Sequence, residues 1–373
     1  MYKENPKVII SGGGTGGHIF PAVAIANAIK FKFPDAEILF VGAKGKMEME
    51  KVPKAGYQIK GLWISGIQRK LTVKNLSFPF KLISSLWNAH KIIKKFKPDI
   101  AIGVGGFASG PLLQSAIWNK IPTLIHESNS FPGITNKILG KNVNTICVAF
   151  PGMEKYFPVK NLVITGNPVR REILRLDGKK NRGTDFFKLN PNQPVLLVIG
   201  GSQGALSINK AIDASLEQLI ERGYQLIWQT GVNYQPIAQE RIKSLNTNQL
   251  QSHAFIYDMD LAYAVADLVV SRAGAMSIAE LTMVKKPSVL VPFPYAAEDQ
   301  QTKNALTLVN YHAAKLVKDE DAKELLFKEV DELLLNPELL NRLAGNIEKL
   351  QVTDATETIL LEVVKLMNKN QNS

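Results

Sequence analysis

The chain of 373 residues is long enough for two domains, and its 45% hydrophobic content is that of a globular protein with full cores. No uninterrupted apolar run approaches the roughly 18 residues that span a bilayer, and no apolar signal segment precedes the first predicted strand. A lone cysteine, Cys147, excludes an internal disulfide, and the formal net charge is +12. We therefore expect a cytosolic protein that crosses no membrane.

The first predicted strand, Val8–Ile10, runs into "SGGGTGGH" and then into a predicted helix, Ile19–Phe31. Glycines at such a turn let the backbone approach a ligand and direct the N–H groups at the helix start toward an anion. Their spacing also satisfies G-x-G-x-x-G, the fingerprint of dinucleotide-binding folds. The next predicted strand, Ile38–Val41, ends in Gly-Ala-Lys without the acid that would hold a ribose, which argues against NAD.

Most of the positive charge lies in one segment, because residues 51–98 contain eleven Lys and Arg and no Asp or Glu. Such a segment suits nucleic acid, an anionic lipid surface, or a solvated face without a partner. In a predicted helix, Phe80–Phe96, a second apolar stripe of Phe80, Ile83 and Trp87 lies away from the core-facing stripe, and lysines continue it. This arrangement favours membrane contact over nucleic acid.

Apolar runs followed by Gly, Ser, His or Asn recur along the first half, as in "DIAIGVGGFASGP" (99–111) and "IPTLIHESN" (121–129). They are typical of a parallel sheet with ligands at the carboxyl ends of its strands. The pattern restarts at "PVLLVIGGSQGA" (194–205) and continues with "YQLIWQTG", "HAFIYD", "DLVVSRAGA" and "PSVLVPFP". We expect an α/β protein with two Rossmann-like, doubly wound domains facing across a cleft. The first domain spans 1–165, joined by a helix at 346–373, and the second spans 166–345.

The chain also carries seven motifs in the order and approximate spacing of the MurG family: "GGGTGGHIFPA", "GVGGFASGP", "HESN", "TGNPVR", "GGSQGA", "SRAGAMSIAE" and "VPFP…EDQQTKNA". It resembles this family over nearly its whole length. MurG enzymes are bacterial glycosyltransferases of the GT-B type, so the resemblance implies that fold. It also implies an inverting transfer of N-acetylglucosamine from its UDP derivative to the C4 hydroxyl of lipid I, the undecaprenyl-diphosphate-linked N-acetylmuramyl pentapeptide. The product is lipid II, used in peptidoglycan synthesis.

The resemblance places most donor contacts in the second domain. Glu280 matches the glutamate that accepts both ribose hydroxyls, although an exposed helix glutamate would give the same pattern. The N–H groups of the helix opened by "RAGAMS" can bind the donor diphosphate. Gln300 and Gln301 match a glutamine pair at the sugar, and a slightly longer loop leaves open which one makes the contact. The implied donor-binding residues are Thr15, Gly16, Gly17, Asn129, Arg170, Ser202, Ile256, Ala275, Met276, Ser277, Ile278, Ala279, Glu280 and Gln300.

His18 is the candidate catalytic base, since an imidazole titrates near pH 6.5 and can take a proton from a hydroxyl. His18 could instead cap the helix or donate a hydrogen bond to phosphate. No histidine has metal-ligand spacing, so we expect neither a metal nor a cofactor. The expected acceptor-binding residues are Gly13, Gly14, Gly105, Gly106, His126 and Glu127, and the expected membrane-facing residues are Phe80, Ile83 and Trp87.

The expected partners are UDP-N-acetylglucosamine, lipid I, an anionic membrane surface and other cell-wall synthesis proteins, with no nucleic acid. The expected location is the cytoplasmic face of the cell inner membrane, as a peripheral protein. One alternative is another GT-B transferase with a different lipid acceptor. The other is a non-catalytic nucleic-acid-binding protein, which leaves the second glycine loop and Glu280 without a purpose.

Overall fold

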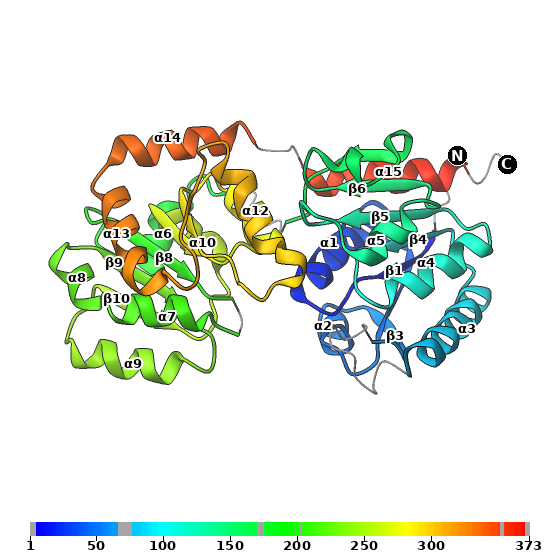
Figure 1. Ribbon diagram of the computed structural model, residues 1–373, viewed down its shortest axis with the longest axis horizontal. Coiled ribbons are helices and arrows are strands. Elements are labelled where there is room, and N and C mark those ends of the chain that lie inside the picture. Colours follow the sequence, from blue (N-terminus) through cyan, green and yellow to red (C-terminus); the bar gives the residue numbers. More distant parts are fainter. Residues whose placement is uncertain are drawn as a thin grey trace. The chain divides into compact units, whose positions relative to one another are not determined.

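The computed structural model describes residues 5–65, 77–169, 173, 175–201, 203–350 and 354–369. The chain divides into two units: unit 1 comprises Met1–Val169 and Val352–Ser373, and unit 2 comprises Arg170–Gln351. A parallel sheet forms the centre of each unit (Figure 1). Within the described residues, no helix is both long and apolar enough to cross a membrane.

Unit 1 contains a seven-stranded sheet in the order β3-β2-β1-β4-β5-β6-β7, in which neighbouring strands are parallel. The order runs outward in both directions from β1 and β4, as in a doubly wound sheet. The strands are β1 (Lys7–Ser11), β2 (Glu37–Ala43), β3 (Gln58–Leu62), β4 (Ile100–Gly103), β5 (Thr123–Glu127), β6 (Thr145–Val148) and β7 (Leu162–Ile164). The helices are α1 (Gly16–Lys32), α2 (Glu48–Lys54), α3 (Phe78–Phe96), α4 (Ser109–Trp118), α5 (Ile134–Leu139) and α15 (Ala355–Lys369).

The core of unit 1 lies on both faces of this sheet because β1 and β4 are continuous apolar runs. On one face, α1 and α15 cover Val8 of β1, and Ile359 and Val363 of α15 belong to the same buried cluster. On the other face, α3 and α4 cover Ile9. The helix α15 therefore belongs to unit 1, although the chain reaches it from unit 2, and Figure 1 shows it in red among blue-to-green elements.

Unit 2 contains a six-stranded sheet in the order β10-β9-β8-β11-β12-β13, again parallel throughout. The strands are β8 (Val195–Ile199), β9 (Gln225–Gln229), β10 (Leu250–His253), β11 (Leu268–Ser271), β12 (Ser288–Leu290) and β13 (Lys315–Leu316). The helices are α6 (Lys179–Phe186), α7 (Leu206–Asp213), α8 (Leu216–Glu221), α9 (Gln235–Ser244), α10 (Met259–Val265), α11 (Ala275–Met283), α12 (Gln300–Val309), α13 (Ala322–Leu334) and α14 (Pro337–Glu348). Its core contains Trp228 of β9, which is fully buried.

The two sheets confirm the predicted fold class of two Rossmann-like α/β domains. The predicted opening strand and helix are confirmed as β1 and α1. The segment "HAFIYD" (253–258) was expected to contain a strand and the loop after it, but β10 ends at His253 and the buried Ile256 lies in the loop. A helix that the sequence did not predict, α6, lies in the polar segment 177–194. It packs on α10, and a Cβ at Gly183 would lie 2.7 Å from Val265, so the glycine permits this close approach.

Candidate active site

The two glycine loops of unit 1 follow the adjacent strands β1 and β4. The chain winds in opposite directions from these two strands. Ligands of open α/β sheets bind at the carboxyl ends of the strands at this point. The loop after β4 is tied to β1 by Val104 N–H, which donates to Ser11 O at 2.7 Å. The Ser109 hydroxyl donates to Ser11 O at 3.1 Å and to Gly105 O at 2.8 Å. These bonds hold the two loops side by side.

Contact between the two loops requires glycine at Gly105 and Gly106, whose φ angles are +102° and +90°. A Cβ at Gly105 would lie 2.7 Å from His18 Cδ2, and a Cβ at Gly106 would lie 2.5 Å from Gly13 O. The structure thus brings together four of the residues that the sequence assigned to the acceptor side and to catalysis: Gly13, His18, Gly105 and Gly106.

The imidazole of His18 is half-buried at the start of α1. Its Nδ1 lies 3.1 Å from the carbonyl oxygen of Gly13. A carbonyl oxygen only accepts, so this contact places the proton on Nδ1 and leaves the lone pair on Nε2. A neutral ring with a bare Nε2 is the form that a general base requires.

One N–H of the first glycine loop is already engaged within unit 1. Gly14 N–H donates to the buried Glu48 carboxylate at 2.9 Å. The sequence interpretation directed the N–H groups of this loop toward the acceptor diphosphate, and the Gly14 N–H points to protein instead. Thr15 is exposed at the N-cap of α1, and Gly16 and Gly17 form the first two residues of that helix.

His126 is fully buried at the end of β5 and does not share the geometry of His18. Its Nε2–H donates to Gly166 O at 3.1 Å. Burial lowers the pKa of His126 to about 4, with the charge of nearby His18 a smaller cause in the same direction. The ring is therefore neutral near neutral pH, and its Nε2 proton is committed to a backbone carbonyl. These contacts suit a supporting role behind the loops better than direct contact with a substrate.

The neighbouring Glu127 is also buried, and its carboxylate organises the loop that follows β5. It accepts hydrogen bonds from Asn129 N–H at 3.0 Å, Gly133 N–H at 3.1 Å and Asn136 Nδ2 at 2.8 Å. Glu127 therefore sets the position of the half-buried Asn129, one of the expected donor contacts.

In unit 2, where the sheet winds in opposite directions from β8 and β11, a glycine loop follows β8 and contacts the loop after β9. Gly204, in the loop after β8, has φ +80°, and a Cβ there would overlap Thr230 O after β9. Two of the expected donor residues, Arg170 and Ser202, lie outside the described residues.

The loop after β11 leads into α11, which begins at Ala275 with Gly274 as its N-cap. The first turn contains Met276 and Ser277, both half-buried, and its N–H groups form the positive end of the helix dipole. Further along, Ile278 is buried in the interior and Ala279 is half-buried. The start of α11 thus has the geometry that binds phosphate groups in many proteins.

Glu280 lies one turn further along α11 and is 7% exposed, so it is not a solvated helix glutamate. Its Oε2 accepts a hydrogen bond from the Tyr263 hydroxyl at 3.1 Å, and Tyr263 is fully buried in α10. A carboxylate held in a fixed orientation suits the bidentate recognition of two neighbouring hydroxyls.

The remaining expected donor residues of unit 2 lie in the loop after β10 and at the start of α12. Ile256 is buried, and its N–H donates to Gln229 Oε1 at 3.0 Å. Gln301 Oε1 accepts from Phe293 N–H at 2.9 Å, so this glutamine holds the loop that precedes α12. Gln300 is the first residue of α12. The two glutamines thus occupy consecutive positions at the start of α12, and Gln301 contacts the backbone of the preceding loop.

Arg272 is a residue of this region to which the sequence interpretation gave no role. Its guanidinium forms an ion pair with Asp319 and donates to Ser207 Oγ at 3.0 Å and to Val291 O at 3.1 Å. It thereby connects the loops after β11 and β12 with α7. The signal was present in "SRAGAMSIAE", where the arginine directly follows the strand.

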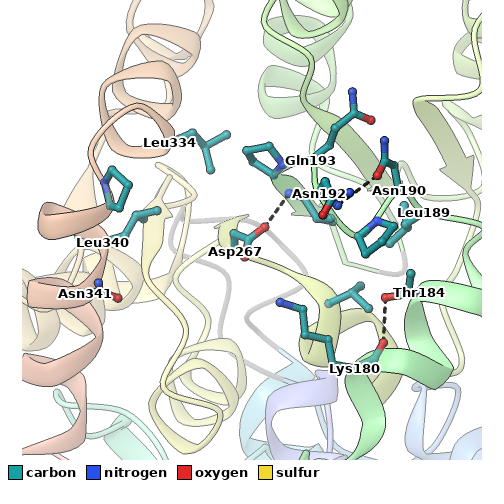
Figure 2. A pocket seen from close by; sticks show the side chains of 15 residues that line it. Lys180, Thr184, Leu189, Asn190, Asn192, Gln193, Asp267, Leu334, Leu340 and Asn341 are labelled. Carbon is teal, nitrogen blue, oxygen red and sulfur yellow. Dashed lines mark hydrogen bonds between the residues drawn. The ribbon is translucent and has the colours of Figure 1, made fainter.

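A pocket of about 360 Å³ lies at the opposite edge of the unit 2 sheet (Figure 2). Val195 begins β8 and Asp267 precedes β11, so the pocket is at the amino ends of these strands. Asp267 Oδ2 accepts from Val195 N–H at 2.8 Å. Its lining contains none of the expected donor residues, and we do not assign it to the reaction.

Comparison with known proteins gives one family match in each of the two units. The Glycosyltransferase family 28 N-terminal domain matches residues 8–148, and the C-terminal domain matches residues 195–359. A UDP-N-acetylglucosamine--N-acetylmuramyl-(pentapeptide) pyrophosphoryl-undecaprenol N-acetylglucosamine transferase of Cytophaga hutchinsonii is 53% identical over 372 residues, which covers 100% of both chains. A protein of the same name from Bacteroides fragilis is 50% identical, covering 99% of this chain and 100% of the relative.

The crystal structure of MurG from Acinetobacter baumannii matches with a TM-score of 0.80 at 29% identity, covering 98% of this chain and 99% of that chain. The chain belongs to the MurG family. The resemblance drawn from the seven motifs is thus confirmed, and so are the GT-B fold and the enzyme class of glycosyltransferase.

Replacing Glu280 by Ala should raise the KM for the UDP-sugar donor strongly. We expect Glu280 to accept both ribose hydroxyls of the donor, and a charge-assisted hydrogen bond contributes about 1.5–3 kcal/mol. We expect at least about a tenfold change, measured in initial-rate kinetics with the acceptor saturating. Glu324→Ala, on α13, is the control for removal of a helix carboxylate and should leave the donor KM unchanged. An unchanged donor KM in Glu280→Ala removes this residue from the donor site.

Proposed function

We propose that this MurG-family enzyme transfers N-acetylglucosamine from UDP-N-acetylglucosamine to the C4 hydroxyl of lipid I, with inversion at the anomeric carbon. The observation that carries the proposal is identity of about 50% over the full length to transferases named for these substrates. Two features support it, because each suits a diphosphate-bearing ligand: the paired glycine loops after β1 and β4 in unit 1, and the helix start after β11 in unit 2.

In this proposal unit 2 binds the donor. The Glu280 carboxylate accepts the ribose hydroxyls, the first turn of α11 faces the diphosphate, and the loop at Ile256 contacts the uracil. Gln300 contacts the sugar. We assign further donor contacts to Arg170 and Ser202, which lie outside the described residues, and to Thr15, Gly16, Gly17 and Asn129 of unit 1.

Unit 1 receives the acceptor. The backbone of Gly13, Gly105 and Gly106 lies against the acceptor diphosphate, with Gly14 in the same loop. His126 and Glu127 support this surface from behind through the hydrogen bonds described above.

The chemistry follows from the position of His18. The C4 hydroxyl oxygen attacks the anomeric carbon, and its proton passes to His18 Nε2. The bond from the anomeric carbon to the diphosphate oxygen breaks, and UDP leaves with the electron pair. The positive end of the α11 dipole stabilises the negative charge on the leaving diphosphate.

A direct test of the proposed reaction uses UDP-N-acetylglucosamine labelled in the sugar and a lipid I analogue with a shortened lipid chain. We expect labelled disaccharide product to form. The ADP-linked sugar should give no product, since the base pocket at Ile256 would be shaped for a pyrimidine. Equal turnover of both donors would overturn the uridine assignment, and transfer to diacylglycerol instead would identify a different lipid acceptor.

Replacing His18 by Ala should lower kcat by about 10²–10⁴-fold, the usual contribution of a positioned general base. The donor KM should change little because the uridine contacts lie in unit 2. The residual rate should lose the limb of the pH–rate profile that protonation of the base produces. If His18 instead donates to phosphate, the acceptor KM rises and that limb stays intact. An intact limb in the variant would end the general-base assignment.

We further propose that α3 docks on the anionic cytoplasmic face of the membrane. Phe80, Ile83 and Trp87 are 71%, 66% and 60% exposed along this helix. The ammonium of Lys91 lies 3.3 Å from the centroid of the Trp87 ring. Lys44 and Lys60 line a pocket beside the same helix. Apolar side chains bordered by lysines are the composition of interfacial membrane-binding helices.

The variant with Phe80, Ile83 and Trp87 all changed to Ser should bind anionic vesicles at least about tenfold more weakly, since each buried apolar side chain contributes about 1 kcal/mol or more. Turnover of a short-chain soluble acceptor should be unchanged. The control changes Ile237, Leu325 and Leu335 to Ser, three exposed apolar residues of unit 2, and should keep vesicle binding. Unfolding of the first variant would show that α3 packs against protein there.

A further inference from the structure

Glu48 has a buried carboxylate to which the reaction described above assigns no function. It is 1% exposed at the first position of α2. Its Oε1 accepts from Ala43 N–H at 2.9 Å, and its Oε2 accepts from Gly14 N–H at 2.9 Å. Glu48 therefore connects the end of β2 with the glycine loop after β1. Burying a carboxylate is expensive unless hydrogen bonds compensate, so its retention here suggests a specific task.

The Gly13–Gly14 peptide group links this carboxylate to His18. The N–H of that peptide donates to Glu48, and its carbonyl accepts from His18 Nδ1 at 3.1 Å. A peptide group is planar and conjugated, so a negative charge at its N–H end increases the electron density on its carbonyl oxygen. Hydrogen bonds in such a chain strengthen one another. The carboxylate thus acts on the imidazole through one intervening amide.

Packing holds this peptide in one orientation. A Cβ at Gly13 would overlap the Glu48 carboxyl, and a Cβ at Gly42 would lie 2.5 Å from Glu48 Cγ. On the other side, the Gly106 backbone lies against Gly13 O. A rotated peptide would place its carbonyl oxygen against the Glu48 carboxylate and lose both hydrogen bonds. The Gly13 carbonyl is therefore fixed toward His18.

We propose that Glu48 is a positioning residue that orients His18 and fixes its Nδ1–H tautomer through the Gly13–Gly14 peptide. The inference rests on the proposed role of His18 as the base. The function of Glu48 resembles that of a carboxylate that is hydrogen-bonded directly to a catalytic histidine and orients it. It differs in having a backbone amide between the two groups, and it leaves Nε2 as the basic nitrogen.

The test replaces Glu48 by Gln, which keeps the shape and removes the charge. Oε1 and Oε2 accept from different N–H groups, so the NH2 group of the Gln side chain must face one of them. In either orientation the peptide loses the negative charge beside it, and one of the two N–H groups loses its acceptor. We expect kcat to fall about 10- to 100-fold, as for other partners that orient a functional histidine, with the donor KM unchanged. Glu50→Gln is the matched control, because Glu50 lies on the same helix, exposed and paired with Lys54, and kcat should not change.

A double-mutant cycle separates positioning from general support of the fold. In the His18→Ala background, Glu48→Gln should change kcat by less than about twofold, since the group that Glu48 orients is gone. Equal losses in both backgrounds would overturn the proposal. A normal kcat in His18→Ala would overturn the base assignment instead, so the two failures are distinguishable.

Nitrogen-15 NMR of the imidazole rings provides a second measurement that uses the unaltered protein. At alkaline pH, protonated and bare ring nitrogens give well-separated signals, and the His18 signals are identified by their loss in His18→Ala. We expect the Nδ1–H tautomer in the wild type, and a mixture of tautomers in Glu48→Gln. An Nε2–H ring in the wild type would overturn the proposal even if the Glu48 variant fails to fold.

Discussion

Direct backbone contact between the loops after β1 and β4 is the constraint on which the site in unit 1 depends. Gly106 lies against the carbonyl of Gly13, and Gly105 lies against the ring of His18. A side chain at either glycine would push the loops apart and remove the surface against which the histidine is held. This contact is possible only because the sheet order makes β1 and β4 neighbours, so topology and loop composition act together.

The second unit uses the same principle with different side chains. Its loops after β8 and β9 also meet through glycine, at Gly204. The charged side chains described in this unit include a buried carboxylate, Glu280, and an arginine, Arg272, that is paired with Asp319. Both units thus contain loops that meet through glycine, and the side chains around each pair of loops give it a different chemistry.

Elements with a strong apolar pattern could be predicted from the sequence, whereas features that depend on tertiary contact could not. The runs at β1 and β8 identified both sheets and their ligand-binding edges. The helix α6 was missed because its sequence is polar and lacks an apolar stripe, although it packs on α10. The role of Glu48 was hidden because its partner, Gly14, is 34 positions away along the chain. The Glu48 side chain also fits only because Gly13 and Gly42 have no Cβ, and the local sequence does not show that these glycines face it.

The return of α15 to unit 1 has a consequence for synthesis of the protein. Ile359 and Val363 complete the cluster that covers one face of the first sheet. During translation this face is covered by α1 alone until α15 has emerged from the ribosome, whereas unit 2 is continuous and all of its strands are made before α15. The order of folding is therefore expected to be the reverse of the order of synthesis, with the unit made first being the last to complete its core.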